Sequence, residues 1–341
     1  MKKLLMLLSL SLLFAACQEE GVSSQSNENQ SSRVIDQNLF KSIDVNFEAG
    51  VAARRSMINK NDPVLDMMTQ INGAISGQGI MLEKVEFLGA EEEGRTVFFN
   101  NNGNKQLSSD FVPNDPNNVG GTAVPYWIDD TQLGTSSGMS EQETFDAFVN
   151  TMETWDAITC SSGLDIPFLG VPGVDVGFVQ FLTGYGGSSS FIPGTILHGG
   201  ILPPEFFEDV LGAGSGDGTI GVTFTFTWTD DVTGEPADID GNRKSDVAIK
   251  EIYINDNFNF QNAPNDVLFD GITDLETVVL HEVGHGLSQG HFGTAFRDSG
   301  QGRLHFSPAA LMNAGYTVGR RYVSNTDESG HCSNWGAWPN E

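Results

Sequence analysis

Positive charge is scarce in this sequence of 341 residues. Only 17 Lys and Arg stand against 45 Asp and Glu, which gives a formal net charge of -28 at pH 7. Such a chain repels nucleic-acid phosphates, so we expect no nucleic-acid partner. A solvated acidic surface explains the charge, and calcium-binding loops are a second explanation.

Long apolar runs are also absent after the first residues. The run Leu4–Phe14 is too short to cross a bilayer as a mature helix. It follows two lysines and precedes two alanines and Cys17, so residues 1–17 predict a secretory signal. This segment resembles a bacterial lipoprotein signal, in which Cys17 carries lipid; an ordinary secretory peptide is the alternative. We expect an extracytoplasmic protein that is lipid-anchored to the bacterial cell envelope (outer membrane or cell surface), or released from it.

Cysteine is rare, with only Cys17, Cys160 and Cys332. If Cys17 carries lipid, two cysteines remain in an oxidising compartment, where an even number favours a disulfide. We therefore expect a Cys160–Cys332 bridge. Two free buried thiols are the alternative.

Periodicity and composition divide the rest of the chain. Residues 18–61 are expected to be a flexible tether, because their first half is polar and low in complexity. Residues 62–121 predict a small α+β unit followed by a linker, with a helix at 63–77 and strands at 81–88 and 95–100.

Residues 122–341 predict the main domain. A capping box at Ser140 and Glu143 starts an amphipathic helix at 141–158, and a second box at Thr273 and Glu276 starts another helix. Strands are expected at 123–130, 174–181, 194–202, 219–228 and 246–255. This order predicts an α/β (α+β) domain with a mixed sheet.

The loop 238–246 spaces oxygen-bearing side chains almost alternately around Gly241. Hard oxygen ligands at this spacing suit Ca²⁺, so a structural calcium site is one prediction. A plain turn between two strands is the other. The candidate ligands are Asp238, Asp240, Asn242 and Asp246.

Three of the six histidines lie in one segment of eleven residues, which begins in the second predicted helix. They are His281, His285 and His291. His281 and His285 are four positions apart, so both project from one helix face and can bind one zinc ion. Glu282 lies beside them, where a carboxylate can serve as a general base. His291 becomes a third ligand only if the helix ends before it.

The segment HEVGHGLSQGH resembles H-E-x-x-H-x-x-G-x-x-H, the zinc motif of the metzincin metalloendopeptidases. It matches the three histidines and the glutamate. Ser288 stands where the family has the glycine at which the chain turns. A left-handed serine there costs about 1 kcal/mol or more, and Gly290 is the alternative site of the turn.

A second resemblance lies downstream. Leu311-Met312-Asn313-Ala314-Gly315-Tyr316 looks like the family's Met-turn, which implies that Met312 lies under the zinc ligands and that Tyr316 lines the specificity pocket. A core methionine is the alternative. The longer spacing before Met312 predicts an inserted loop at about 294–308 that borders the cleft.

The likeness to the matrixin-like branch, the matrix metalloproteinase type, covers about 122–341. It implies a twisted five-stranded mixed sheet packed on two long helices, with a small C-terminal subdomain that carries the Met-turn. It also implies that 194–202 is the edge strand to which a substrate adds. His198, in that strand, is not expected to bind metal.

Residues 62–121 stand where the family keeps a propeptide. No cysteine lies between 17 and 160, so a cysteine cannot block the metal. A carboxylate such as Asp110 or Asp115 is the candidate instead, and a permanent accessory domain is the alternative.

The resemblance implies a monomeric zinc endopeptidase of extracellular proteins, in which Glu282 is the general base for a metal-activated water. A surface binding protein or adhesin with weak or no protease activity is the alternative. A zinc amidase would share the metal without the Met-turn.

Overall fold

The computed structural model describes residues 34–57, 62–100, 108–113, 115, 121–263 and 271–340. The expected signal, Cys17 and the first part of the tether lie outside these ranges. Within them, no helix is both long and apolar enough to cross a lipid bilayer.

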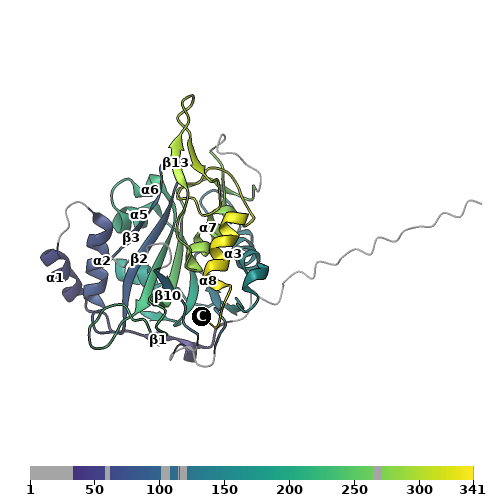
Figure 1. The fold of residues 1–341 in the computed structure, drawn as a ribbon. Helices are drawn as coiled ribbons and strands as arrows, with labels where there is room; N and C mark the ends of the chain where they lie inside the picture. Colours follow the sequence, from purple (N-terminus) through teal and green to yellow (C-terminus); the bar gives the residue numbers. More distant parts are fainter. Residues whose placement is uncertain are drawn as a thin grey trace, which may run out of the picture.

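A mixed sheet runs through the middle of the protein (Figure 1). Its order is β3-β2-β9-β10-β8-β5-β6, and β4 pairs with β10. β10, β8, β5 and β6 are mutually parallel, whereas β9, β2 and β3 continue the sheet antiparallel. The strands are β2 (Ile80–Gly89), β3 (Arg95–Phe98), β4 (Ser109–Asp110), β5 (Tyr126–Ile128), β6 (Phe168–Gly170), β8 (Thr195–Leu202), β9 (Thr219–Trp228) and β10 (Ser245–Asn255).

The α/β class with a mixed sheet is confirmed, but the expected strand number is wrong. The described residues form eight strands in this sheet, not five. The additional strands β2, β3 and β4 all come from residues 62–121, so this unit shares the sheet of the main domain. Residues 34–57 also differ from a flexible tether, since they contain β1 (Lys41–Ser42), which pairs with β7 (Ser190–Phe191), and α1 (Phe47–Met57).

Helices cover both faces of the sheet, rather than two helices on one face. One apolar core lies between the sheet and α3 (Glu141–Asp156), α7 (Leu275–Gly286) and α8 (Asn325–Trp335). A second core lies on the opposite face, under α2 (Pro63–Ala74), α4 (Phe178–Thr183) and α5 (Pro204–Leu211). Figure 1 shows α1 outside α2 on this side.

Two predicted strands have a different role in the structure. Residues 178–183 form α4, because the buried Glu251 carboxylate accepts hydrogen bonds from the amides of Phe178 (2.6 Å) and Val179 (2.8 Å) at the helix start. The segment 194–202 is a strand, β8, but it lies inside the sheet between β10 and β5. The prediction that a peptide adds to it is therefore wrong, since both of its sides are already hydrogen-bonded.

The starts of α3 and α7 are set by their caps. Ser140 and Glu143 form the predicted capping box of α3. At α7 the cap is Asp274, one residue later than predicted, and its side chain accepts from the amide of Thr277 (3.1 Å). Asp274 also pairs with Arg321, so the start of α7 is held by a second segment.

The predicted disulfide is present, and it links η2 (Thr159–Ser161), just after α3, to α8. The two cysteines are 172 positions apart in the sequence. The bridge therefore ties two distant segments together beside the core that contains α7.

The double variant Cys160→Ser/Cys332→Ser should lose about 2–5 kcal/mol of unfolding free energy, because the bridge restricts a long loop of the unfolded chain. Guanidinium denaturation measures this loss. Reduced wild type is the matched control and should unfold together with the variant. Equal stability of oxidised wild type and the variant would contradict the prediction.

Candidate metal centre

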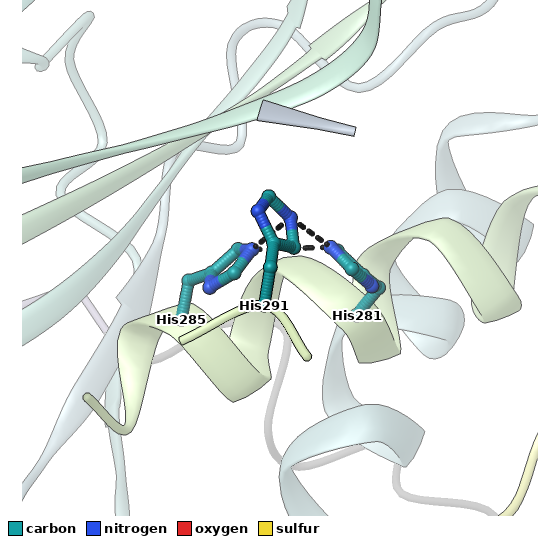
Figure 2. Close-up of side chains that lie close together, drawn as sticks. All are labelled: His281, His285 and His291. Carbon is teal, nitrogen blue, oxygen red and sulfur yellow. Dashed lines mark hydrogen bonds between the residues drawn. The ribbon is translucent and has the colours of Figure 1, made fainter. Parts of the chain in front are cut away.

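Three imidazoles meet above the C-terminal half of α7 (Figure 2). The Nε2 atoms of His281 and His285 are 3.1 Å apart, those of His285 and His291 3.0 Å, and those of His281 and His291 3.2 Å. Three nitrogen ligands of one tetrahedral zinc ion lie about 3.3 Å apart, given Zn–N distances near 2.0–2.1 Å. Among the described residues, this is the group of His, Cys, Asp and Glu side chains that could hold a metal ion.

Backbone carbonyls orient two of the rings. His281 Nδ1 lies 2.7 Å from the carbonyl of Leu311, and His285 Nδ1 lies 2.7 Å from that of Gln289. Each Nδ1 donates its proton there, which leaves Nε2 with a free lone pair for a metal. Burial lowers the pKa of His281 to about 4, so the ring is neutral, as ligation requires.

Helix α7 ends at Gly286, five residues before His291, so that the chain can turn and bring His291 back to the other two histidines. Ser288 has a φ of 64°, in the left-handed region. Its amide bonds to the carbonyl of His285 (2.9 Å), and the amide of Gln289 bonds to that of Gly284 (2.9 Å). These two bonds form a Schellman motif, in which the left-handed residue is commonly glycine. Ser288 itself makes the turn, and the alternative that Gly290 makes it is wrong.

Side chains from other elements satisfy the last carbonyls of α7. Unpaired carbonyls at a helix end are costly when buried, so each of these contacts holds the turn in place. The donors are Lys250 Nζ to His285 (2.9 Å), Trp335 Nε1 to Leu287 (3.0 Å) and Asn334 Nδ2 to Ser288 (3.1 Å).

Met312 is fully buried directly under the helix. A Cβ added to Gly284 would lie 2.3 Å from Met312 Sδ, so only glycine permits this contact. The carboxylate of Asp327 on α8 accepts hydrogen bonds from the amides of Met312 (3.0 Å) and Leu311 (2.9 Å). Asp327 therefore holds the turn whose Leu311 carbonyl orients His281.

Glu282 points from α7 toward strand β9. Thr223 Oγ1 donates to Glu282 Oε2 at 2.7 Å, and Gly221 leaves space for the carboxylate against the strand. Burial raises the pKa of Glu282 well above its ordinary value, opposed by the Thr223 hydrogen bond and reinforced by the charge of Glu86.

Glu86 on β2 is a second buried carboxylate at the histidines. Its Oε1 lies 3.4 Å from His285 Nδ1, and its Oε2 pairs with Lys84 Nζ at 2.9 Å. On the neighbouring strand β3, Thr96 Oγ1 lies 3.4 Å from His291 Nδ1. Residues 62–121 thus contribute polar groups to the centre.

Tyr316 lines a small cavity of about 20 Å³ beside His281. Its hydroxyl accepts a hydrogen bond from the amide of Asp274 at 2.9 Å, so it also supports the start of α7. The predicted inserted loop is a hairpin of β13 (Thr294–Arg297) and β14 (Leu304–Ser307). It borders a larger adjoining cavity of about 460 Å³, which Tyr316 also lines.

No protein-family model matches the chain, and no curated protein matches it.

The structure brings only part of the predicted site residues together. In the loop 238–246, Asp238 accepts from the amide of Gly241 (2.8 Å) and Asp240 from that of Asn242 (3.0 Å), as in a turn between β9 and β10. Asp246 accepts from the amide of Ile239, and burial raises its pKa to about 7. These bonds are those expected of the turn, and calcium binding there remains a prediction.

Other expected residues lie away from the histidines. Asp110 pairs with Lys244 (2.6 Å), and Asp115 borders a different small cavity with Phe111. His198 is buried and stacked on the ring of Phe148, outside the metal-binding group.

Sequence reasoning missed Glu86, Thr223 and Asp327. Glu86 and Thr223 belong to alternating strands, and Asp327 lies in the first turn of a polar helix, α8. None of them stands near the zinc motif in sequence, and only the folded chain brings them to it. We find no sequence signal that could have identified them.

Ser288→Gly should raise the unfolding free energy by roughly 0.5–1 kcal/mol, because glycine adopts the left-handed conformation without the Cβ penalty. Urea denaturation measures the gain. Ser288→Ala is the matched control, since it keeps Cβ and removes the buried hydroxyl, which has no hydrogen-bond partner among the described residues. An equal gain in both variants would assign the effect to the hydroxyl instead.

The protein should bind one zinc ion per chain, and His291→Ala should weaken binding by more than about a hundredfold. Competition with a coloured chelator measures the affinity. His305→Ala is the control, because His305 is exposed and pairs with Asp298 away from the centre. Unchanged affinity in His291→Ala would remove His291 from the ligand set.

Proposed function

We propose that the protein is a metzincin-like zinc-dependent endopeptidase that cleaves extracellular proteins. The observation that carries this proposal is the convergence of three imidazoles whose Nε2 atoms lie within 3.2 Å of one another. Two of them, with Glu282, are on α7, and His291 follows the turn that ends this helix. Three histidines leave one position of a tetrahedral zinc ion open for chemistry, whereas structural zinc sites usually have four protein ligands.

Further features support the metzincin-like assignment. Met312 lies under the histidine helix, and Ser288 makes the turn at the position of the family's glycine. A bound zinc ion would be held by His281, His285 and His291 and would supply Lewis-acid chemistry for attack by water on a peptide carbonyl.

Glu282 is the residue that moves the proton. Thr223 holds one carboxylate oxygen, and Oε1 has no hydrogen-bond partner in the described part of the chain. In the proposed reaction Glu282 accepts a proton from the attacking water and delivers it to the amine nitrogen as the C–N bond breaks. One water is consumed, and a carboxylic acid and an amine are formed.

The proposal extends to the substrate, the oligomeric state and the location of the whole protein. The substrate is a protein or peptide, the chain acts as a monomer, and a lipid on Cys17 anchors it to the cell envelope. A surface binding protein on the same scaffold remains the second candidate, because the edge of β9 beside the centre is already paired with β2.

Glu282→Ala should keep its zinc and lose roughly 10²–10⁴-fold in kcat/KM, since proton transfer by a positioned carboxylate contributes about that much. Long incubations with denatured protein, followed by mass spectrometry, measure cleavage, and metal analysis measures zinc. Glu282→Gln is the isosteric control for shape. Equal cleavage by Glu282→Ala and wild type would reject the enzyme, and absence of cleavage in both would favour the binding protein.

A further inference from the structure

Strand β2 lies where a peptide would have to lie to reach the metal centre. It pairs antiparallel with β9 along residues 80–89, so that β9 has no open edge there. β9 carries Thr223, which holds Glu282, and Glu86 of β2 stands directly opposite Thr223. Side chains of directly opposed residues lie on one face of a sheet, so Glu86 faces α7 together with Thr223.

The other side of β2 pairs with β3 at residues 84–87 and, at Gly89, with the segment that follows Met312. Gly89 and Gly315 form a parallel bridge, in which the amide of Gly89 donates to Ala314 (3.1 Å) and the amide of Tyr316 donates to Gly89 (2.9 Å). The Gly89 end of β2 therefore lies between β9 and residues 314–316, whereas residues 84–87 lie between β9 and β3. An extended peptide held on both sides in this way gains main-chain hydrogen bonds without a sequence requirement.

Leu88 supplies the side-chain contact. It is 2 % exposed and lines the cavity that His281, Thr277, Leu311 and Tyr316 also line. The remaining volume of about 20 Å³ has room for roughly one water molecule. Leu88 thus forms part of the wall of a small cavity directly beside a candidate metal ligand.

Arg297 holds the turn between β2 and β3 against the β13–β14 hairpin while β2 is paired with β9. Arg297 of the β13–β14 hairpin donates to the carbonyl of Glu91 (2.8 Å) and pairs with Glu92 (2.7 Å). Both side chains of this ion pair are largely solvent-exposed, so the pair is weak. Opening requires residues 86–89 of β2 to leave β9 together with the part of β3 that is paired with them, while the other end of β2 stays in the second core.

We infer that β2 is an internal, substrate-like strand that competes with peptides for the groove of the metal centre. This rests on the proposed function. The substrate is then an extended peptide that runs antiparallel to β9 and parallel to residues 314–316. Its medium-sized aliphatic side chain would take the place of Leu88 beside His281. Glu86 enters the centre only while β2 is in place.

Binding of a labelled peptide tests the competition without relying on activity. The probe is fluorescein-KVEFLGAE, the sequence of residues 84–91, and the control probe has aspartate in place of leucine. Fluorescence anisotropy is measured on the full zinc-loaded chain in the Glu282→Ala background, where the probe is not cleaved. Leu88→Asp should increase affinity for the probe at least tenfold, and Leu88→Ala should give a smaller increase.

Met81→Ala is the matched control, because Met81 is buried in the same strand at the end remote from Glu86. It should leave probe affinity unchanged. Hydrogen exchange provides a second readout: probe binding should expose the amides of residues 86–89. Equal probe affinity in all variants, or equal binding of both probes, would overturn the inference, and circular dichroism checks that each variant is folded.

Cleavage separates this inference from the proposed function. With Glu282 intact, Leu88→Asp should cleave the probe faster than wild type by at least tenfold. Tighter probe binding without cleavage would reject the peptidase and keep the substrate-like strand. Cleavage by wild type as fast as by Leu88→Asp would keep the peptidase and reject the competition by β2.

Discussion

The left-handed turn at Ser288 is the constraint on which the centre depends. A helix that continued past Leu287 would carry His291 away from the face shared by His281 and His285. The turn is kept by its two backbone bonds and by side chains of β10 and α8 that satisfy the carbonyls around it. The geometry of three imidazoles is thus stabilised by contacts distant in sequence.

A polar layer between the sheet and α7 distinguishes this face from an ordinary core. Lys84, Glu86, Thr223 and Lys250 are all buried, and they come from β2, β9 and β10. Buried charges are costly unless they are paired. Lys84 pairs with Glu86 two residues along the same strand, and Lys250 of β10 donates to the carbonyl of His285 on α7. The pairing of β2 with β9 brings Lys84 and Glu86 of residues 62–121 into this layer.

The sequence was sufficient for features that depend on local pattern. Periodicity located α3 and most strands of the main sheet, and the spacing of His281, Glu282 and His285 predicted a shared helix face. The sequence was not sufficient where tertiary contacts determine the local structure. Glu251 converts 178–183 into a helix, and the pairing of β8 on both sides has no local signal. Glu86 and Asp327 reach the centre only through long-range packing, which periodicity does not report.

The position of α8 has a consequence for the order of assembly as the chain emerges N-terminus first during the proposed export. β2 and β9 precede α7 in the chain and emerge first during this export, whereas Asp327, Asn334 and Trp335 emerge only afterwards. The strand that covers the groove is therefore available to pair before the side chains that anchor Met312 and the end of α7. An emerging chain has its groove covered first and its metal centre completed last.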